Sequence, residues 1–196
     1  MKDNVREALL EARSALDSLI ANDEAVEKID NAGNLLATAI QNGGHIYSCG
    51  NGGSLCDAMH FSEEMTGRFR KDRSPWPAQA IADASHMSCV SNDYSYENVF
   101  ARYVQAFGRK GDVLLGISTS GKSRNVILAA RAAKELGMKV LVLTGKPGSE
   151  LEQYADIAIV TPGGRFADRV QELHIKCIHI LIELVERRLA PENYTD

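Results

Sequence analysis

Five short runs of β-branched and aliphatic residues alternate along this chain with stretches of helical periodicity. The runs occupy residues 45–49, 78–82, 113–118, 139–144 and 156–160, and helical stretches lie between most of them. Parallel strands need long crossover connections, usually helices, and the sheet that results is covered on both faces. The alternation therefore predicts an α/β fold, a doubly wound five-stranded parallel sheet flanked by helices.

Helical patterns also stand at both ends of the strand-rich region. Two segments before the first strand repeat apolar residues at helical spacing until Asn42 and two glycines end the pattern. A final helix is expected over residues 168–189, and its apolar circumference favours burial on more than one side, in an oligomer. We expect a single domain over residues 1–196, with residues 1–42 as an N-terminal helical pair used in oligomer packing and residues 43–196 as the α/β core and C-terminal helix.

The composition excludes several classes of protein. Hydrophobic residues make up 44% of the 196 residues and charged residues 24%, which is ordinary for a globular chain, and the formal net charge of -4 offers no basic surface for nucleic acid. No segment reaches the roughly 18 uncharged apolar residues of a membrane-spanning helix, and the first twenty residues are too charged for a signal peptide. We expect a cytoplasmic protein with no nucleic acid and no membrane among its partners.

The cysteines and three of the five histidines lack the spacing of metal ligands. The four cysteines form no CxxC pair, and we interpret them as reduced core thiols: Cys49, Cys56, Cys89 and Cys177. Three histidines have no partner at metal spacing and are predicted to be structural or exposed, with the second of them in a loop: His45, His86 and His174.

Two loops that follow strands have the composition of an anion site. Residues 50–54, GNGGS, follow the first strand and open a helix near Leu55, while residues 118–123, STSGKS, follow the third strand and open another helix. Glycines let the backbone approach a ligand, and free amides and hydroxyls gather at the positive end of each helix. Either loop alone is equally well explained as an ordinary capped turn.

The strand order decides whether the two loops act together. In the common doubly wound, flavodoxin-like order 2-1-3-4-5, the sheet reverses between strands one and three, which are the strands that these loops follow. Both loops then line one crevice. Neither loop matches the GxxxxGK[ST] or GxGxxG pattern, so the sequence favours a small phosphate ester over a nucleotide.

Several motifs resemble the sugar isomerase (SIS) domain family, most closely its isomerases of phosphorylated heptoses. They are CGNGGS at residues 49–54, DAMHFSEEMTGR at 57–68, SND at 91–93, GDVLLGISTSGKS at 111–123 and ADRVQELHIKCIHILI at 167–182. The likeness runs over nearly the whole chain. HxxxE at residues 60–64 together with QExHxxxxH at 171–179 is specific to few members of the family.

The resemblance implies a SIS fold, an activity and a set of site residues. The reaction would convert D-sedoheptulose 7-phosphate to D-glycero-D-manno-heptose 7-phosphate through an enediol, the first step toward the heptose of lipopolysaccharide core, in a homotetramer with one zinc ion per subunit. Proton transfer would be carried by Glu64 and His179. The phosphorylated seven-carbon sugar would be bound by Asn51, Gly52, Gly53, Ser54, Asn92, Asp93, Ser118, Thr119, Ser120, Ser123 and Gln171.

The chemistry of such a reaction suits these residue types. Moving a carbonyl between neighbouring carbons needs one base and one acid, and Glu64, on a helix among apolar residues, is interpreted as the base with His179 as the acid. The predicted metal ligands are His60, Glu64, Gln171 and His179. His60 and Glu64 lie on one face of their predicted helix. Gln171 and His179 are about 12 Å apart along the final helix, which is too far for both to reach one ion easily, so we expect sites shared between subunits.

Alternatives remain at the level of sequence. The four predicted metal ligands also suit direct binding of the substrate. A non-catalytic SIS-domain protein that binds the replication initiator would keep the fold but lack the base, which here is Glu64. A sugar-phosphate sensor would need an added DNA-binding segment, and an isomerase of a shorter phosphosugar would have the same phosphate loops.

Overall fold

Five parallel strands form one sheet in the order β2-β1-β3-β4-β5. The computed structural model describes residues 1–195, so Asp196, the last residue of the predicted domain, lies outside the described residues. The fold class and the strand order predicted from sequence are confirmed, and the strand ends differ from prediction by at most two residues. The strands are β1 (Ile46–Cys49), β2 (Ala78–Ala80), β3 (Val113–Ser118), β4 (Lys139–Thr144) and β5 (Ile157–Val160).

Helices connect the strands and precede the sheet. The α-helices are α1 (Lys2–Ile20), α2 (Asp23–Gln41), α3 (Gly53–Thr66), α4 (Ala84–Asp93), α5 (Val99–Phe107), α6 (Arg124–Glu135) and α7 (Ala167–Leu189). The 3-10 helices are η1 (Tyr96–Asn98), η2 (Glu150–Tyr154) and η3 (Pro191–Tyr194). Within residues 1–195, no helix has both the length and the apolar character needed to cross a membrane.

The loop predicted around His86 is wrong, because this residue lies in α4. The Asp83 side chain accepts a hydrogen bond from the His86 backbone amide at 2.7 Å and thereby caps the helix. The apolar periodicity of α4 is weak, and Val90 is its one buried residue, so the capping aspartate indicates this helix more clearly than its apolar pattern does.

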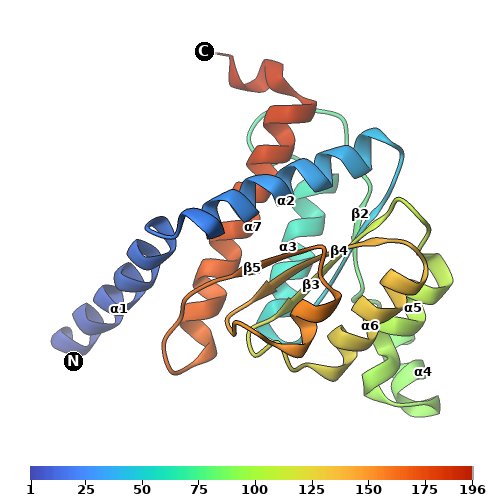
Figure 1. The fold of residues 1–196 in the computed structure, drawn as a ribbon, viewed down its shortest axis with the longest axis horizontal. Helices are drawn as coiled ribbons and strands as arrows, with labels where there is room; N and C mark the ends of the chain where they lie inside the picture. The colour runs from blue at the N-terminus through green and yellow to red at the C-terminus, as the bar shows by residue number, and fades with distance from the viewer. Residues whose placement is uncertain (196) are drawn as a thin grey trace.

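The sheet separates two hydrophobic cores, and the layers are visible in Figure 1. Along β3, Val113, Leu115 and Ile117 belong to the core shared with α2, α3 and α7, whereas Leu114 belongs to the core shared with α5 and α6. Successive side chains of a strand point to opposite faces, which explains the alternation. All six residues of β3 are buried, as expected of the central strand of a covered parallel sheet.

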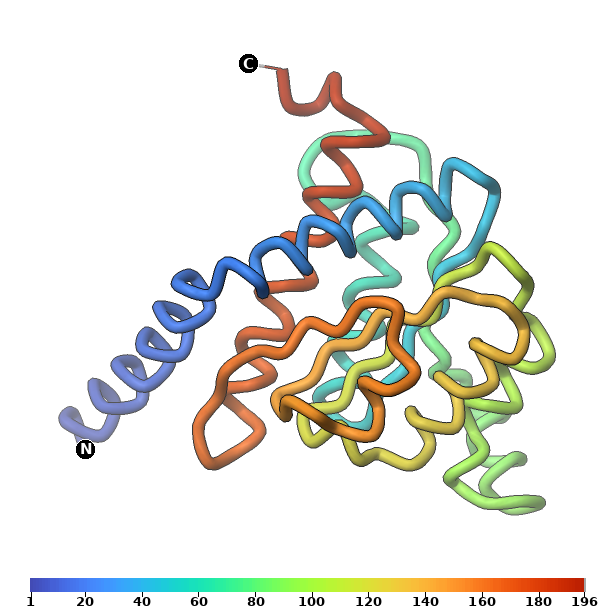
Figure 2. The backbone as a smooth tube through the Cα atoms, in the orientation of Figure 1, coloured from blue at the N-terminus to red at the C-terminus, as the bar shows by residue number. Residues whose placement is uncertain are grey.

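Helix α1 extends away from the sheet, as Figure 2 shows at the N-terminal end of the tube. Leu19 is its only fully buried residue. Large apolar side chains on α1 remain exposed: Val5, Leu9, Leu10 and Ile20. The predicted N-terminal helical pair is therefore present, and much of its first helix has no covering from its own chain.

The cysteines divide into two pairs by burial. Cys49 and Cys177 are buried, and burial raises the pKa of each thiol to about 12. Cys56 and Cys89 are exposed, so the prediction of core thiols is wrong for these two. Cys56 lies on the exposed face of α3 and Cys89 on the exposed face of α4. Their place in a helix did not determine which face they would occupy.

Helix α2 packs against α7 at a glycine. A Cβ atom added to Gly33 would lie 2.7 Å from Leu184 Cβ, closer than side-chain carbons approach one another. Gly33 is buried in the middle of α2, so the contact sets the distance between two helices that cover the same face of the sheet.

We predict that Gly33→Leu lowers the free energy of unfolding by about 1–3 kcal/mol, because the added side chain overpacks this contact. Asn34→Leu, on the exposed side of the same helix, serves as the matched control and is expected to change stability little. Urea denaturation of both variants measures the difference. Equal unfolding free energies would contradict the close approach of α2 and α7.

Candidate functional site

A reciprocal pair of amide hydrogen bonds joins the loops after β1 and β3. Asn51 Nδ2 donates to Asn125 Oδ1 at 2.9 Å, and Asn125 Nδ2 donates back to Asn51 Oδ1 at 2.8 Å. Asn125 is 4% exposed and lies in the first turn of α6, directly after the second loop. The loops therefore lie side by side, as the strand order predicts. Asn125 was not predicted as a site residue. It could have been found as an amide side chain on the buried side of the first turn of a helix.

The first loop ends in the N-terminal turn of α3. Gly52 caps this helix with a φ of 54°, a left-handed conformation that favours glycine. Ser54 is buried in the first turn. Gly53 faces α7, since a Cβ added there would lie 2.6 Å from Gln171 Nε2. The structure thus brings Gln171 to the predicted phosphate loop of its own chain.

The second loop is held by its own hydroxyl groups. Ser118 Oγ donates to Ser123 Oγ at 2.9 Å, and the Ser120 hydroxyl accepts from the Lys122 amide at 3.2 Å. These bonds shape a turn whose remaining amides stand at the N-terminus of α6. Such a turn attracts an anion through free amides and the helix dipole.

A cavity of about 180 Å³ opens beside Thr119 and Ser120. Its lining also includes Lys146, from the loop after β4, and Arg165, from the loop before α7. Their two positive charges suit a phosphate group and extend the anion site beyond hydroxyls and amides. Sequence reasoning missed both residues because they belong to loops without a recognised motif.

Asn92 and Asp93 lie at the C-terminal end of α4. Both are exposed, and Asn92 Nδ2 donates to Asp93 Oδ1 at 2.8 Å. The Tyr96 hydroxyl, three residues later, donates to Asn51 Oδ1 at 2.9 Å. Through Tyr96, the segment that carries this predicted pair is tied to the first loop.

Two histidines and a glutamate converge between α3 and α7. His60 Nε2 lies 2.9 Å from His179 Nε2 and 3.7 Å from Glu64 Oε1. The two imidazole rings meet edge to face, with centroids 5.1 Å apart. Because His60 and Glu64 are four residues apart on α3, their side chains emerge on one face, and α7 brings His179 to that face.

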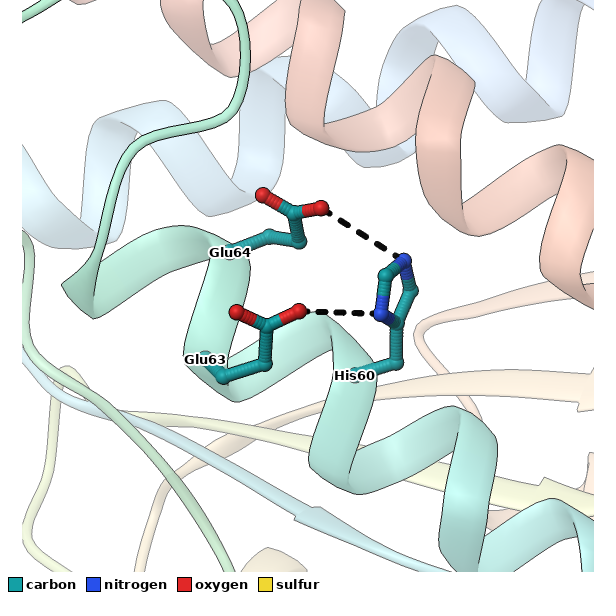
Figure 3. Close-up of side chains that lie close together, drawn as sticks. All are labelled: His60, Glu63 and Glu64. Carbon is teal, nitrogen blue, oxygen red and sulfur yellow. Dashed lines mark ion pairs between the residues drawn. The ribbon is translucent and has the colours of Figure 1, made fainter.

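Glu63 orients His60 from the other side of its ring. Figure 3 shows the imidazole between the two carboxylates, with Glu63 at one nitrogen and Glu64 toward the other. His60 Nδ1 lies 2.9 Å from Glu63 Oε1, so a proton on Nδ1 leaves the Nε2 lone pair directed at His179. Glu63 was not among the predicted site residues, although its spacing of three from His60 allows this contact.

Burial shifts the proton affinities of the predicted acid and base. It raises the pKa of Glu64, and the charge of Glu63 raises it further. The pKa of His179 is lowered, first by burial and then by the charges of His60 and Lys176. A carboxylate with a raised pKa is a stronger base, and a histidine near neutrality exchanges protons readily.

A third carboxyl group lies on the same helix between the loop and the histidines. Asp57 Oδ2 is buried and has no hydrogen-bond partner among residues 1–195, and burial raises the pKa of Asp57 to about 6. The positive charge of a protonated His60 partly opposes this shift. Asp57 was not predicted as a site residue.

The donor set of the cluster fits a zinc ion. Two imidazole nitrogens and a carboxylate oxygen are ligands that zinc prefers, and they come from His60, His179 and Glu64. His60, Glu63 and Glu64 also form a group able to hold a metal ion. Gln171, the fourth predicted ligand, stands about 12 Å from His179 along α7, with its side chain against Gly53.

A larger cavity lies elsewhere. It has a volume of about 580 Å³ and is lined by the junction of α1 and α2 and by the end of β5, including Ser18, Asn22, Lys28 and Thr161. None of the predicted site residues lines it. We therefore base the site on the converging side chains of α3, α7 and the two loops.

Comparisons with known proteins agree with this geometry. Residues 10–145 match the SIS domain family. The chain is 54% identical over 191 residues to the phosphoheptose isomerase of Pectobacterium atrosepticum, covering 97% of this chain and 99% of that one. It is 55% identical over 188 residues to the phosphoheptose isomerase of Histophilus somni, covering 96% of each. The structure of phosphoheptose isomerase from Neisseria gonorrhoeae is similar, with a TM-score of 0.87 and 38% identity over 94% of this chain and 98% of that one.

His174 lies inside the protein, one turn after Gln171 on α7. It is 0% exposed, and its ring nitrogens make no hydrogen bond of good geometry within residues 1–195, although the Thr144 backbone lies near enough to oppose the lowering of the pKa in part. Burial lowers the pKa of His174 from 6.5 to about 4. This histidine is structural, as predicted, and it must stay neutral for the domain to remain folded.

We predict that His174 makes the domain sensitive to acid. Because its pKa is lower in the folded chain, the unfolded chain binds more protons between pH 6.5 and 4, and stability falls as the pH falls through this window. His174→Gln should show a shallower loss, by up to about 1.4 kcal/mol per pH unit. Urea denaturation at pH 7, 6, 5 and 4 measures this, with the exposed His45→Gln as control. Parallel curves for wild type and His174→Gln would contradict the prediction.

Proposed function

The chain belongs to the phosphoheptose isomerase family of SIS-domain proteins, and from this membership we propose that it converts D-sedoheptulose 7-phosphate to D-glycero-D-manno-heptose 7-phosphate through an enediol. This is the first step of heptose synthesis for lipopolysaccharide core. The observation that carries the proposal is the convergence of Glu64, His60 and His179 beside the phosphate loops of the same chain. A phosphosugar isomerase needs a phosphate-binding region and a proton-transfer cluster in one site.

The two parts of the site lie at different positions along α3 and α7. Gly53 and Gln171 mark the phosphate end, and His60 and His179 mark the reacting end, about 10 Å further along α3. The separation supports a substrate whose phosphate is several carbons away from its carbonyl group. A seven-carbon sugar phosphate has this form.

The phosphate group binds to the loops and fixes the orientation of the sugar. Hydroxyls of the second loop and the amides of α3 and α6 hold its oxygens, and Lys146 and Arg165 balance its charge. Asn51, Asn92, Asp93 and Gln171 provide amide and carboxylate groups for the sugar hydroxyls. This binding places the carbons that exchange a proton at the reacting end.

Glu64 removes the carbon-bound proton, and His179 moves a proton between the two oxygens of the enediol. Glu64 then returns its proton to the neighbouring carbon, which completes the isomerisation without net consumption of acid or base. Partial burial raises the pKa of the Glu64 carboxyl group, which favours this role. Phe69, with its ring centroid 5.8 Å from that of His179, limits access of water to the acid.

His60, Glu64 and His179 would hold a zinc ion, with the glutamine at position 171 of a neighbouring subunit as the fourth ligand. When bound, zinc polarises the substrate carbonyl. Glu63 supports this arrangement by fixing the ring of His60.

The enzyme works as a homotetramer with active sites at subunit interfaces. The exposed apolar side chains of α1, among them Leu9 and Leu10, support a role of the N-terminal helices in this assembly. The reaction takes place in the cytoplasm, where phosphorylated sugars are formed.

Glu64→Gln and His179→Gln are each expected to lower the rate of sedoheptulose 7-phosphate conversion by about 100-fold or more, because each removes a proton-transfer group. NMR of the product in purified wild type and variants measures this. Glu135→Gln, an exposed glutamate of α6, makes the same chemical change away from the site and should leave the rate unchanged. Inert wild-type protein, with and without added zinc, would overturn the isomerase proposal.

Zinc is expected to stabilise the folded wild-type chain, because it binds the assembled cluster and not the unfolded chain. At zinc concentrations about 100 times the dissociation constant, the gain is about 2.7 kcal/mol. Thermal unfolding with chelator and with zinc measures the shift. His60→Ala should lose it, whereas His45→Ala, at an exposed histidine, should retain it. An equal zinc-dependent shift in both variants would exclude His60 as a ligand.

A further inference from the structure

A buried ion pair joins the loop after α3 to α7. Arg73 Nε lies 3.0 Å from Glu186 Oε1, and the exposed fractions of the two side chains are 2% and 0%. Arginine and glutamate are rarely buried this fully. A buried ion pair is also weak support for stability in itself, because desolvation opposes the attraction between the charges. The position of this pair relative to the site gives it a further role.

Arg73 binds the C-terminal end of α3, the helix that carries His60 and Glu64. Its guanidinium donates to the Glu64 carbonyl at 2.6 Å and to the Met65 and Gly67 carbonyls at 2.8 and 3.1 Å. The last carbonyls of a helix have no partner within it, so Arg73 acts as the cap of α3. Its guanidinium also lies 3.9 Å from the centre of the Trp76 ring, which further fixes its position.

Glu186 holds the guanidinium from α7. The Tyr194 hydroxyl donates to Glu186 Oε2 at 2.7 Å, so both carboxylate oxygens have partners. Glu186 lies seven residues after His179, which is close to two helical turns, and the two side chains therefore project from similar faces of α7. The ion pair connects the backbone of Glu64 to the helix that carries His179.

Three residues of the loop after α3 contact the same part of α7. Phe69 packs beside His179, Arg70 pairs with Glu183 at 2.7 Å, and Arg73 pairs with Glu186. The Arg70 pair is partly exposed, with fractions of 51% and 24%, whereas the Arg73 pair is buried. Only Arg73 contacts the backbone of the proposed catalytic base.

We propose that the Arg73–Glu186 pair is a positioning device, which fixes the last turn of α3 and thereby holds the Glu64 carboxylate at its working distance from His179. The inference rests on the proposed isomerase function. Arg73 and Glu186 touch neither the reacting atoms nor the phosphate loops, so they are positioning residues. Small displacements of a reacting group cost large factors in rate, which makes such a device effective.

A purely structural role and a positioning role predict different results when both charges are removed together. Replacing a buried ion pair with apolar residues of similar volume often leaves stability unchanged, whereas removing one partner leaves an unpaired buried charge. Arg73→Met combined with Glu186→Leu therefore separates the two roles. The double variant loses the cap on Glu64 and retains a filled core.

The experiment measures kcat and KM for sedoheptulose 7-phosphate, together with the thermal unfolding midpoint, in wild type and the double variant. We expect an unchanged midpoint, a fall in kcat of tenfold or more, and a KM within about twofold of wild type, because the phosphate loops are distant. The double variant Arg70→Met with Glu183→Leu is the matched control on the same loop and helix. It should retain the wild-type kcat.

A double variant with the wild-type kcat would overturn the proposal. If the double variant does not fold, Arg73→Gln combined with Glu186→Gln, which removes both charges together and leaves neither unpaired, decides the question by the same tenfold criterion for kcat. Arg73→Lys adds a second check, since lysine retains the charge but lacks the planar guanidinium that reaches Glu186 and the carbonyls of α3 together. We expect this variant to retain more of the wild-type stability than of the wild-type kcat. Inert wild-type protein would overturn the proposed function instead, so the two failures are distinguishable.

Discussion

Helix α3 lies so close to α7 that a Cβ on Gly53 would collide with the Gln171 side chain. Seven residues later on α3, His60 meets His179, which is eight residues later on α7. The two helices therefore run in the same direction and stay in contact over this length. Gln171, His60, Glu64 and His179 take their places in the candidate site from this contact. A Cβ on Gly53 would force the end of the Gln171 side chain to move.

The sheet determines where this helix pair begins. Strands β1 and β3 are neighbours, so the helices that follow them, α3 and α6, start side by side and direct their free amides toward the same region. The Asn51–Asn125 pair locks the two starts together. Lys146 and Arg165 add two positive charges beside the second loop, at the cavity lined by Thr119 and Ser120.

Sequence predicted the parts of the molecule that depend on local pattern. Covered parallel strands appear as short apolar runs, which located all five strands, and the glycine and serine loops followed from their place after β1 and β3. Several of the residues that sequence missed act through contacts between distant segments. Asn125 pairs with a residue 74 positions away, and Glu186 pairs with one 113 positions away. No periodicity signals such a pair, because either partner alone resembles an ordinary helix residue.

The distance along the chain between the two histidines has a consequence for synthesis of the protein. His60 and His179 are 119 residues apart, and α7 is the last long helix to leave the ribosome. The phosphate loops and all five strands are synthesised before His179, but α7 contributes much of one hydrophobic core, so the domain folds as a unit only once α7 is made. The chain can therefore transfer protons only after α7 has been made and has packed against α3. An assay of turnover thus also reports that α7 is in place.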